Sequence, residues 1–239
     1  MVLAILALWT TRAAAALQFD GNTCAWVADC PALRLTDELT IEAWLKLDET
    51  IVNRTFAMVV SKNWETTGYE LTVLDRPNHR LHGTDLVPGH ADKPILPLGK
   101  WIHVAYARSL SKAKLYVDGK LVTTRPTGSP LLPNDLPMWI GSSNLVDQEG
   151  KPCRFIGSIA EIRLWSAARS EANIRRTRNR RLHGRETHLV AVFDFRKGGG
   201  QLIANPTRKT GPLVLGTTAE PDPQDPTWVS VGNLPSRVK

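Results

Sequence analysis

The sequence lacks the residue patterns of several common functional sites. Its 3 cysteines include no Cys-x-x-Cys pair, which argues against a zinc site or a thiol-redox site. No apolar run reaches the roughly 20 residues that a helix needs to cross a bilayer. There is no nucleophile elbow, and no helical pattern follows the glycine-rich segment 197–201, which argues against a phosphate-binding loop.

The composition is that of a folded domain with an uneven charge distribution. Of the 239 residues, 42% are hydrophobic and 22% are charged, as in globular proteins with a substantial core. The formal net charge is +7. The stretch from Arg163 to Arg185 holds eight arginines and one acid, Glu171, so it accounts for the whole excess. We therefore expect a local basic patch.

The first 16 residues have features of a targeting segment. A short apolar run, Val2–Trp9, precedes small residues with Ala-x-Ala spacing at Ala13–Ala16. No Lys or Arg precedes that run, so two interpretations stay open: a cleaved signal peptide, or a retained segment docked on a membrane or a partner. We expect an extracytoplasmic protein with one domain over residues 17–231 and a tail over 232–239.

Short strand-like runs alternate with turn signals from Leu17 onward, as in a sandwich or a barrel. In residues 39–47 the odd positions are apolar and would share one buried face. Asp118-Gly119 supplies the positive-φ residues of a tight hairpin turn. Residues 227–231 predict a last edge strand after a proline-rich connection.

Only one segment has a convincing helix signature. Ser170 can cap the helix, and Glu171 suits its positive end. Ile174 and Leu182 would form its apolar stripe, and the pattern predicts an end near Gly184. The fold class is therefore all-β with one short basic helix.

Nine segments in order resemble the LamG-like jelly-roll domain of the concanavalin A-like lectin/glucanase superfamily, in its pentraxin-related branch. They are LQFDG, LTIEAWLK, VVSK, GYELTV, GKWIHVAYA, KLYVDGKLV, WIGSS, GSIAEIRLWSAARSEANI and LVAVFDF. The resemblance covers Leu17 to Val231 and implies a two-sheet antiparallel sandwich. Because this fold hosts lectins, glycosidases and adhesion modules, it does not by itself imply an activity.

The resemblance also allows a test for glycosidase activity. The glucanases of the superfamily place paired carboxylates on one strand as Glu-x-Asp-x-Glu, and this sequence has no such run. Glu38 and Glu42 flank Thr40 at what we interpret as a solvent-facing strand edge. Glu161 stands alone, and we expect it to pair with an arginine such as Arg163. The sequence predicts a protein that is not an enzyme.

Calcium is the cofactor that the resemblance implies most often, through loop carboxylates and amides. The loop after WIGSS offers weak candidate ligands, namely Asn144, Asp147, Gln148 and Glu149. The partner loop should contain an Asp-Asn pair but reads Asn53-Arg54. Asp20 is a further candidate, although it can instead shape its own turn. A solvated loop is the favoured interpretation, with calcium kept as the alternative.

Histidines and cysteines give two further candidate groups. Three histidines and two acids share the loop 79–92, where zinc binding is possible but surface histidines are the favoured interpretation; they are His79, His82, Asp85, His90 and Asp92. In an exported protein we expect one disulfide among the three cysteines. The strand arrangement that the resemblance implies weakly favours Cys24–Cys153 over the pairings with Cys30.

The basic patch and the tryptophans are the candidate binding groups. The patch consists of Arg175, Arg176, Arg178, Arg180 and Arg181. It would suit a protein partner, anionic lipid headgroups, phosphates or sulfated glycans. The patch has no aromatic side chains for base stacking, which argues against nucleic acid. Trp26 and Trp64 could stack on sugars, while the resemblance places Trp44, Trp101, Trp139 and Trp165 at core positions.

The leading hypothesis is a non-catalytic binding or scaffolding domain that acts as an accessory subunit, through protein contacts at or near a membrane. The alternative is a lectin-like, carbohydrate-binding module that uses the loops around Trp64 and Asn144, with or without calcium. A glycoside hydrolase with an atypical site is the third hypothesis.

Overall fold

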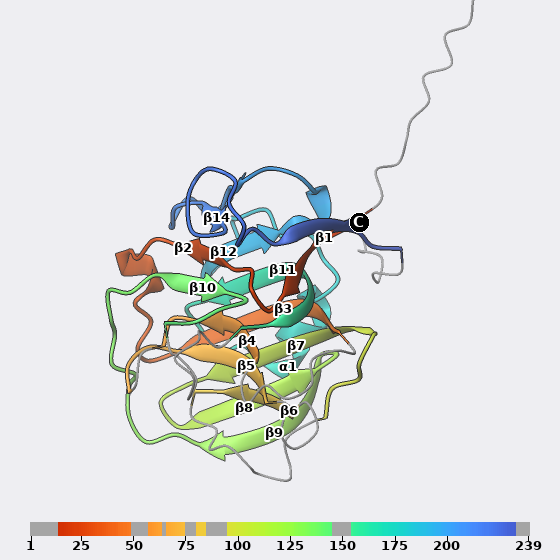
Figure 1. Cartoon of the computed structure of the whole chain (residues 1–239). Coiled ribbons are helices and arrows are strands. Elements are labelled where there is room, and N and C mark those ends of the chain that lie inside the picture. Colours follow the sequence, from red (N-terminus) through yellow and green to blue (C-terminus); the bar gives the residue numbers. More distant parts are fainter. Residues whose placement is uncertain are drawn as a thin grey trace, which may run out of the picture.

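The computed structural model describes residues 14–48, 57–63, 66–74, 80–84, 95–144 and 154–232, without the side chains of Leu74, Arg80 and His82. These residues form two stacked β-sheets, and one short helix lies behind the larger sheet (Figure 1). All strand pairs within the two sheets are antiparallel. The predicted all-β jelly-roll sandwich is confirmed.

The larger sheet, sheet A, has eight strands. Seven follow the order β15-β1-β11-β3-β7-β8-β9, and β12 pairs with β11. Their bounds are β1 Ala15–Asp20, β3 Leu39–Leu47, β7 Trp101–Arg108, β8 Lys112–Val117, β9 Lys120–Pro126, β11 Ile156–Trp165, β12 Leu189–Asp194 and β15 Thr227–Ser230.

The smaller sheet, sheet B, has seven strands in the order β13-β14-β2-β10-β4-β5-β6. Their bounds are β2 Ala25–Val27, β4 Ala57–Ser61, β5 Glu70–Leu74, β6 Arg80–Gly83, β10 Met138–Ile140, β13 Leu202–Ile203 and β14 Leu213–Leu215. Sheet B lies in front of sheet A in Figure 1.

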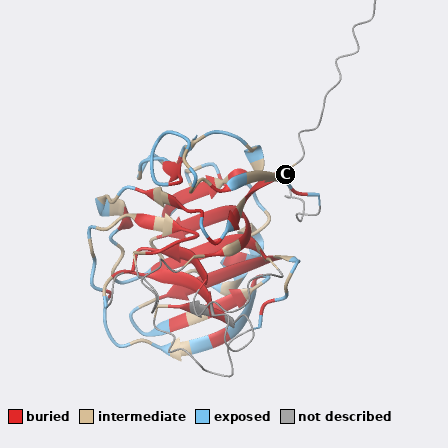
Figure 2. Cartoon of the chain, in the orientation of Figure 1, coloured by how far each residue is buried: buried red, intermediate tan, exposed pale blue. Residues whose placement is uncertain are grey.

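The core lies between the two sheets, where alternate strand residues meet (Figure 2). The odd positions of β3, from Leu39 to Leu47, are all buried in it, as the alternation predicts. The predicted tight turn joins β8 to β9, with φ of 50° at Asp118 and 76° at Gly119. The predicted last strand is β15 at the edge of sheet A.

The helix α1 spans Glu171–Thr177. Ser170 caps it as predicted, because its Oγ accepts a hydrogen bond from the Asn173 amide at 3.3 Å. The predicted end near Gly184 is wrong, since the last helical residue is Thr177. Leu182 does not extend the apolar face of α1; it packs in a separate cluster with Trp165, Leu189 and Val192. Two short 3-10 turns, η1 (Pro31–Leu33) and η2 (Phe195–Lys197), complete the regular structure of the described residues.

The two ends of the described chain lie together. The Val231 amide donates to the Ala14 carbonyl at 2.7 Å, beside the β1–β15 pair. The predicted domain start at Leu17 falls inside β1, whose first residues are Ala15 and Ala16. None of the described residues forms a helix long and apolar enough to cross a membrane.

Candidate binding site

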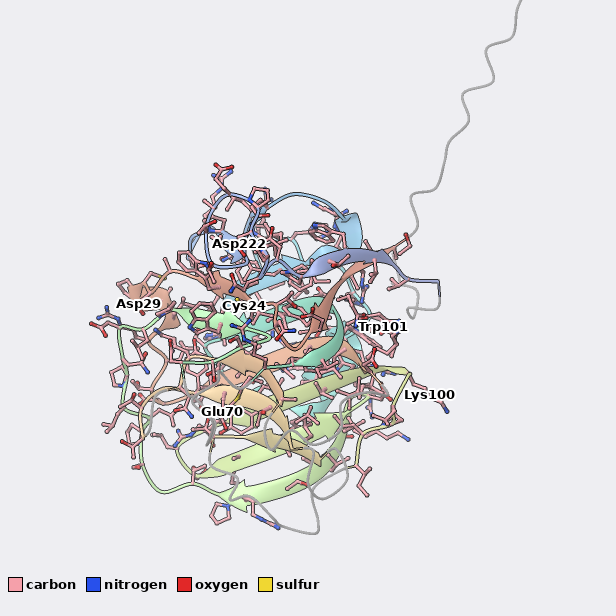
Figure 3. All side chains as sticks on the ribbon, viewed as in Figure 1. Cys24, Asp29, Glu70, Lys100, Trp101 and Asp222 are labelled. Carbon is pink, nitrogen blue, oxygen red and sulfur yellow. The ribbon has the colours of Figure 1, made fainter. Side chains whose placement is uncertain are left out.

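A cross-strand row of four side chains runs over the outer face of sheet B. In register, Trp26 of β2 pairs with Trp139 of β10, Trp139 with Ser61 of β4, and Ser61 with Glu70 of β5. We call these four residues the sheet B row. Their strand neighbours are buried in the core, so the alternation of a β-strand turns the row away from sheet A. Glu70 is labelled on this sheet in Figure 3.

The two tryptophans form the aromatic half of the row. Both are half-buried, and the Trp139 Nε1 donates to the Asn144 Oδ1 at 2.8 Å. Within the described part of the chain, the buried Trp26 Nε1 and Asn144 Nδ2 have no hydrogen-bond acceptor. Because buried N–H groups in native proteins nearly always have a partner, these two donors indicate a place for acceptor oxygens.

The other half of the row is polar. Glu70 and Ser61 are buried, and the Asn63 Nδ2 donates to the Glu70 Oε2 at 2.9 Å. Thr72, two residues after Glu70, shares its face and bonds the Ala57 carbonyl at 2.9 Å. Among the described outward-facing residues of β2, β4, β5 and β10, Glu70 is the one carboxylate. The described residues of these four strands therefore do not supply the paired carboxylates that a glycosidase needs.

The structure places two of the tryptophans on the outer face of sheet B. Trp26, a predicted stacking residue, lies in β2 on that face. Trp139 was expected in the core, yet it is half-buried and faces outward. The alternation in Met138-Trp139-Ile140 contained this signal, because Met138 and Ile140 both face the core. Trp44 and Trp165 are buried as expected.

The described calcium candidates already have roles within the protein. The Asp20 Oδ1 accepts from the amides of Asn22 at 2.8 Å and Thr23 at 3.1 Å, so Asp20 shapes its own turn. Burial alone would raise the pKa of Asp20, but these bonds lower it. The Asn144 Oδ1 is occupied by Trp139. Among the described residues, no group of three His, Cys, Asp or Glu side chains could hold a metal.

Several candidates lie outside the described residues, and their roles stay predictions. They are Asp147, Gln148 and Glu149 for calcium, Asn53 and Arg54 of the partner loop, Trp64 for stacking, the loop residues His79, Asp85, His90 and Asp92, and Cys153. The His82 side chain is also not described.

The cysteine prediction is not confirmed. Cys24 and Cys30 are both free thiols. The Cys24 Sγ lies 3.4 Å from the Gly216 carbonyl oxygen, and burial raises the pKa of this thiol to about 11. Cys24 lies at the same end of the sandwich as Asp222 (Figure 3), whose charge adds to that rise. The Cys24–Cys153 disulfide is therefore not formed in this structure.

A buried charge cluster lies on the outer face of sheet A, and it corrects the prediction for Glu42. This residue is fully buried and not at a solvent-facing strand edge. Its carboxylate lies 3.1 Å from the His103 Nε2, 3.2 Å from the Arg169 Nε and 3.6 Å from an Arg163 nitrogen. Thr40 and Trp44, its neighbours on that face, bond the carbonyls of Ala167 and Arg178 instead of water.

Burial alone would raise the pKa of Glu42, but the His103 hydrogen bond and the nearby arginines hold it below its usual value. Burial lowers the pKa of His103 despite Glu42. His103 is therefore neutral and donates through Nε2, while its buried Nδ1 has no partner within the described residues. Two groups in these fixed states are poor candidates for proton transfer.

Arg163 joins this cluster to α1. As expected, it pairs with Glu161, at 3.1 Å from Nε to Oε1 and 3.2 Å from Nη2 to Oε2. Its Nη atoms also donate to the carbonyls of Thr177, Arg178 and Arg180 at 3.0, 3.2 and 2.9 Å. These bonds satisfy carbonyls at the end of α1, which gives a physical reason for its early termination.

The basic stretch thus divides into an interior and a surface part. Arg163 is buried, and Arg169 is mostly buried with its guanidinium 3.7 Å from the Trp165 ring centre. The exposed arginines, which we call the arginine surface, are Arg175, Arg176, Arg180, Arg181 and Arg185. Arg178, predicted to belong to it, is half-buried and pairs with Asp118 at 3.3 Å.

Comparison with known proteins agrees with this architecture. A family model described as the concanavalin A-like lectin/glucanases superfamily matches residues 20–175. A Bacteroides ovatus protein provisionally described as carbohydrate-binding has 18% identity and a TM-score of 0.67, over 90% of this chain and 62% of its own. This chain thus spans less than two thirds of that protein.

A heptameric, SAP-like pentraxin from Limulus polyphemus has 13% identity and a TM-score of 0.52, over 70% of this chain and 82% of its own. At these identities both similarities indicate the fold alone. No curated protein has a significantly similar sequence.

Proposed function

We propose that this chain, which belongs to the concanavalin A-like lectin/glucanases superfamily, is a non-catalytic, extracytoplasmic domain. The proposed domain binds a carbohydrate on the sheet B row. The observation that carries this proposal is the pair of adjacent tryptophans with two unpartnered, buried N–H donors beside them. The description of the Bacteroides ovatus protein as carbohydrate-binding supports it.

The chemistry of the row fits a sugar ring. An indole offers an apolar face for the C–H groups of a pyranose, while amide and indole N–H groups donate to its hydroxyl oxygens. A buried donor without a partner costs about 1–3 kcal/mol, so a ligand oxygen that reaches it would bring a gain of similar size. At the polar end of the row, the Asn63 Nδ2 holds the Glu70 carboxylate in place at 2.9 Å.

The arrangement of the described carboxylates supports the non-catalytic part of the proposal. Hydrolysis requires an acid and a base or nucleophile on either side of the glycosidic bond. Glu70 has no described carboxylate partner on its face of β2, β4, β5 and β10. Glu42 and Glu161 are held by arginines beneath α1.

The test is a binding assay with neutral oligosaccharides, such as glycan-array screening followed by calorimetry. We expect Trp139→Ala to weaken binding about tenfold or more, because an aromatic anchor is removed. Trp101→Ala, a half-buried tryptophan on sheet A, is the matched control and should leave binding unchanged. If the wild type binds no glycan, or if Trp139→Ala binds as tightly as the control, the proposal is wrong.

The same titration with calcium and with a chelator tests the cofactor. A calcium-dependent affinity would support the predicted ligands in the loop after Asn144. Equal affinity in both conditions would reject the calcium-dependent version and leave the sugar site in place.

A second candidate function is docking to a membrane-associated protein through the arginine surface, as an accessory subunit. The favouring observation is that the Arg180, Arg181 and Arg185 side chains have no hydrogen bond or ion pair within the described residues. Charge reversal at Arg180 and Arg185 should reduce co-purification of a membrane partner. Unchanged co-purification would reject this candidate.

A further inference from the structure

A pocket lies where the edges of the two sheets approach each other, beside β12 and β13. Its volume is about 470 Å³, within the range of about 300–1,000 Å³ that is typical of ligand pockets. We call it the edge pocket. Its walls come from four separate parts of the chain: the segment after α1, strand β12, the connection from η2 to β13, and strand β15.

The polar part of the edge pocket is basic. Arg181 and Lys197 are exposed at its rim, and neither side chain has a hydrogen bond or ion pair in the described parts of the chain. His183 adds a third basic group. The one acid of the lining is Asp194, whose Oδ1 accepts from the Arg196 amide at 3.2 Å. The lining therefore has two permanent positive charges against one acid, so positive charge is in excess.

The apolar part of the edge pocket contains one aromatic side chain, Trp228. The ring is fixed at two points, because its Nε1 donates to the Gly200 carbonyl at 3.3 Å and its ring packs edge-on against Phe195. The ring centres are 6.3 Å apart. Leu202, 52% exposed, continues the apolar wall. A fixed, half-buried indole beside two cations fits a ligand with both an apolar face and a negative charge.

The edge pocket is close to the sheet B row. Leu202 is in register with Val214 of β14, and Val214 is in register with Trp26. Two strand spacings of about 4.8 Å separate Leu202 from Trp26, which is roughly the length of two sugar units. Val214 and Leu202 are both apolar, so no charge interrupts this path.

We propose that the edge pocket binds an anionic sugar residue, a hexuronate or a sulfated hexose. The sugar ring packs on Trp228, and its carboxylate or sulfate accepts hydrogen bonds from Arg181 and Lys197. This inference rests on the proposed function in taking the ligand to be a carbohydrate, but it concerns different residues. A second hollow of about 660 Å³ is lined by His183, Arg185 and Glu186, so an acid balances its one permanent cation and the excess of positive charge belongs to the edge pocket.

The experiment compares three probes of equal length: a neutral hexose oligosaccharide, a hexuronate oligosaccharide and a sulfated oligosaccharide. Their affinities are measured for the wild-type protein and for the double variant Arg181→Ala/Lys197→Ala. Both residues are exposed, so the fold should be retained. The matched control is Arg175→Ala, which removes an equally exposed positive charge outside the pocket. Trp139→Ala is measured in parallel to report on the sheet B row.

We expect the wild type to prefer at least one of the anionic probes, and the double variant to lose that preference by about tenfold or more. Its affinity for the neutral probe should not change. The identity of the preferred probe distinguishes a carboxylate ligand from a sulfate ligand. Trp228→Ala should weaken the binding of the preferred anionic probe at every salt concentration at which binding is measured.

Three results would overturn the inference: no anionic probe is preferred, the double variant keeps the preference, or Arg175→Ala weakens binding as much as the double variant. The last result would indicate diffuse attraction to the arginine surface. None of these results contradicts the proposed function, which is tested by the binding of the neutral probe and by the effect of Trp139→Ala on that binding. Conversely, if only the binding of the neutral probe fails, the assignment of the edge pocket to an anionic sugar still holds.

Discussion

Replacement of Arg163 by methionine tests whether the buried charge cluster holds α1 against sheet A. Methionine retains most of the side-chain length but removes the guanidinium. The change breaks two bonds to Glu161 and three bonds to the carbonyls of residues 177, 178 and 180. It also removes the cation 3.6 Å from Glu42. Two buried carboxylates then lose their shared positive neighbour.

The size of the effect follows from burial. Arg163 and Glu161 are each 1% exposed, and Glu42 is fully buried. Removing one partner of a buried ion pair costs about 3–5 kcal/mol when the other charge is left unpaired. Glu42 keeps Arg169 at 3.2 Å and Glu161 keeps Arg196 at 3.6 Å, so we expect the lower end, about 3 kcal/mol. A domain's unfolding free energy is about 5–15 kcal/mol, so this loss is a fifth of it or more. Arg163→Lys keeps the charge but not the forked geometry, and we expect an intermediate loss.

Urea unfolding followed by tryptophan fluorescence measures this difference. The midpoint should fall strongly while the slope stays the same, which indicates a change in stability without a change in the surface exposed. Arg175→Met is the control, since its side chain is 65% exposed and its loss should cost less than about 0.5 kcal/mol. A midpoint for Arg163→Met equal to that of the control would refute the structural role of the cluster.

The remaining predictions concern pH, reactivity and local geometry. The folded-state pKa values of Glu42 and His103 are both lowered, so the unfolded state binds more protons as the pH falls. The unfolding free energy should therefore have its full value above about pH 6.5 and decrease below it, by up to about 1.4 kcal/mol per pH unit for each proton. An unfolding free energy that rises toward acid pH would contradict this. With a pKa of about 11, the Cys24 thiol should be about 0.1% ionised at pH 8 and resist Ellman's reagent in the native protein, and rapid labelling would contradict its burial. Ser170→Ala should cost about 1 kcal/mol in chemical unfolding, and no loss would mean that its cap bond is unimportant. Gly141→Ala should cost more than about 2 kcal/mol in thermal unfolding, because φ is +72° and a Cβ would lie 2.3 Å from the Phe19 ring; unchanged stability would contradict that contact.

Glu42 illustrates what strand alternation can and cannot predict. Its position in β3 predicts correctly that it points away from the core between the sheets. The pattern does not reveal that α1 and the chain that follows it cover this outer face. The covering segment lies more than 120 residues later in the sequence. Its burial depends on tertiary packing, and the prediction of a solvent-facing residue was wrong for that reason.

The arginines of residues 163–185 show the same limit. Their number and spacing predict a basic patch, and five of the eight arginines are exposed. The sequence does not distinguish Arg163 and Arg169, which are internal partners of Glu42 and Glu161, from the exposed ones. Charge counting treats all arginines alike, whereas burial decides which of them can meet a ligand.

The sheet B row and the edge pocket required the tertiary structure. The row combines residues 26, 61, 70 and 139, and the pocket combines residues 181, 197 and 228, so neither has a local signature. Only the strand order and register bring them together.

By itself, the sequence determined most of the strands, the Asp118-Gly119 turn, the Ser170 cap and the family of the fold, but not the short strands β2, β6, β13 and β14. These features depend on short-range periodicity, on backbone preferences and on the order of segments along the chain. The tertiary structure alone decided which outer faces are covered, where α1 ends and which side chains share a surface. Those outcomes depend on contacts between residues far apart in sequence, which no local pattern encodes.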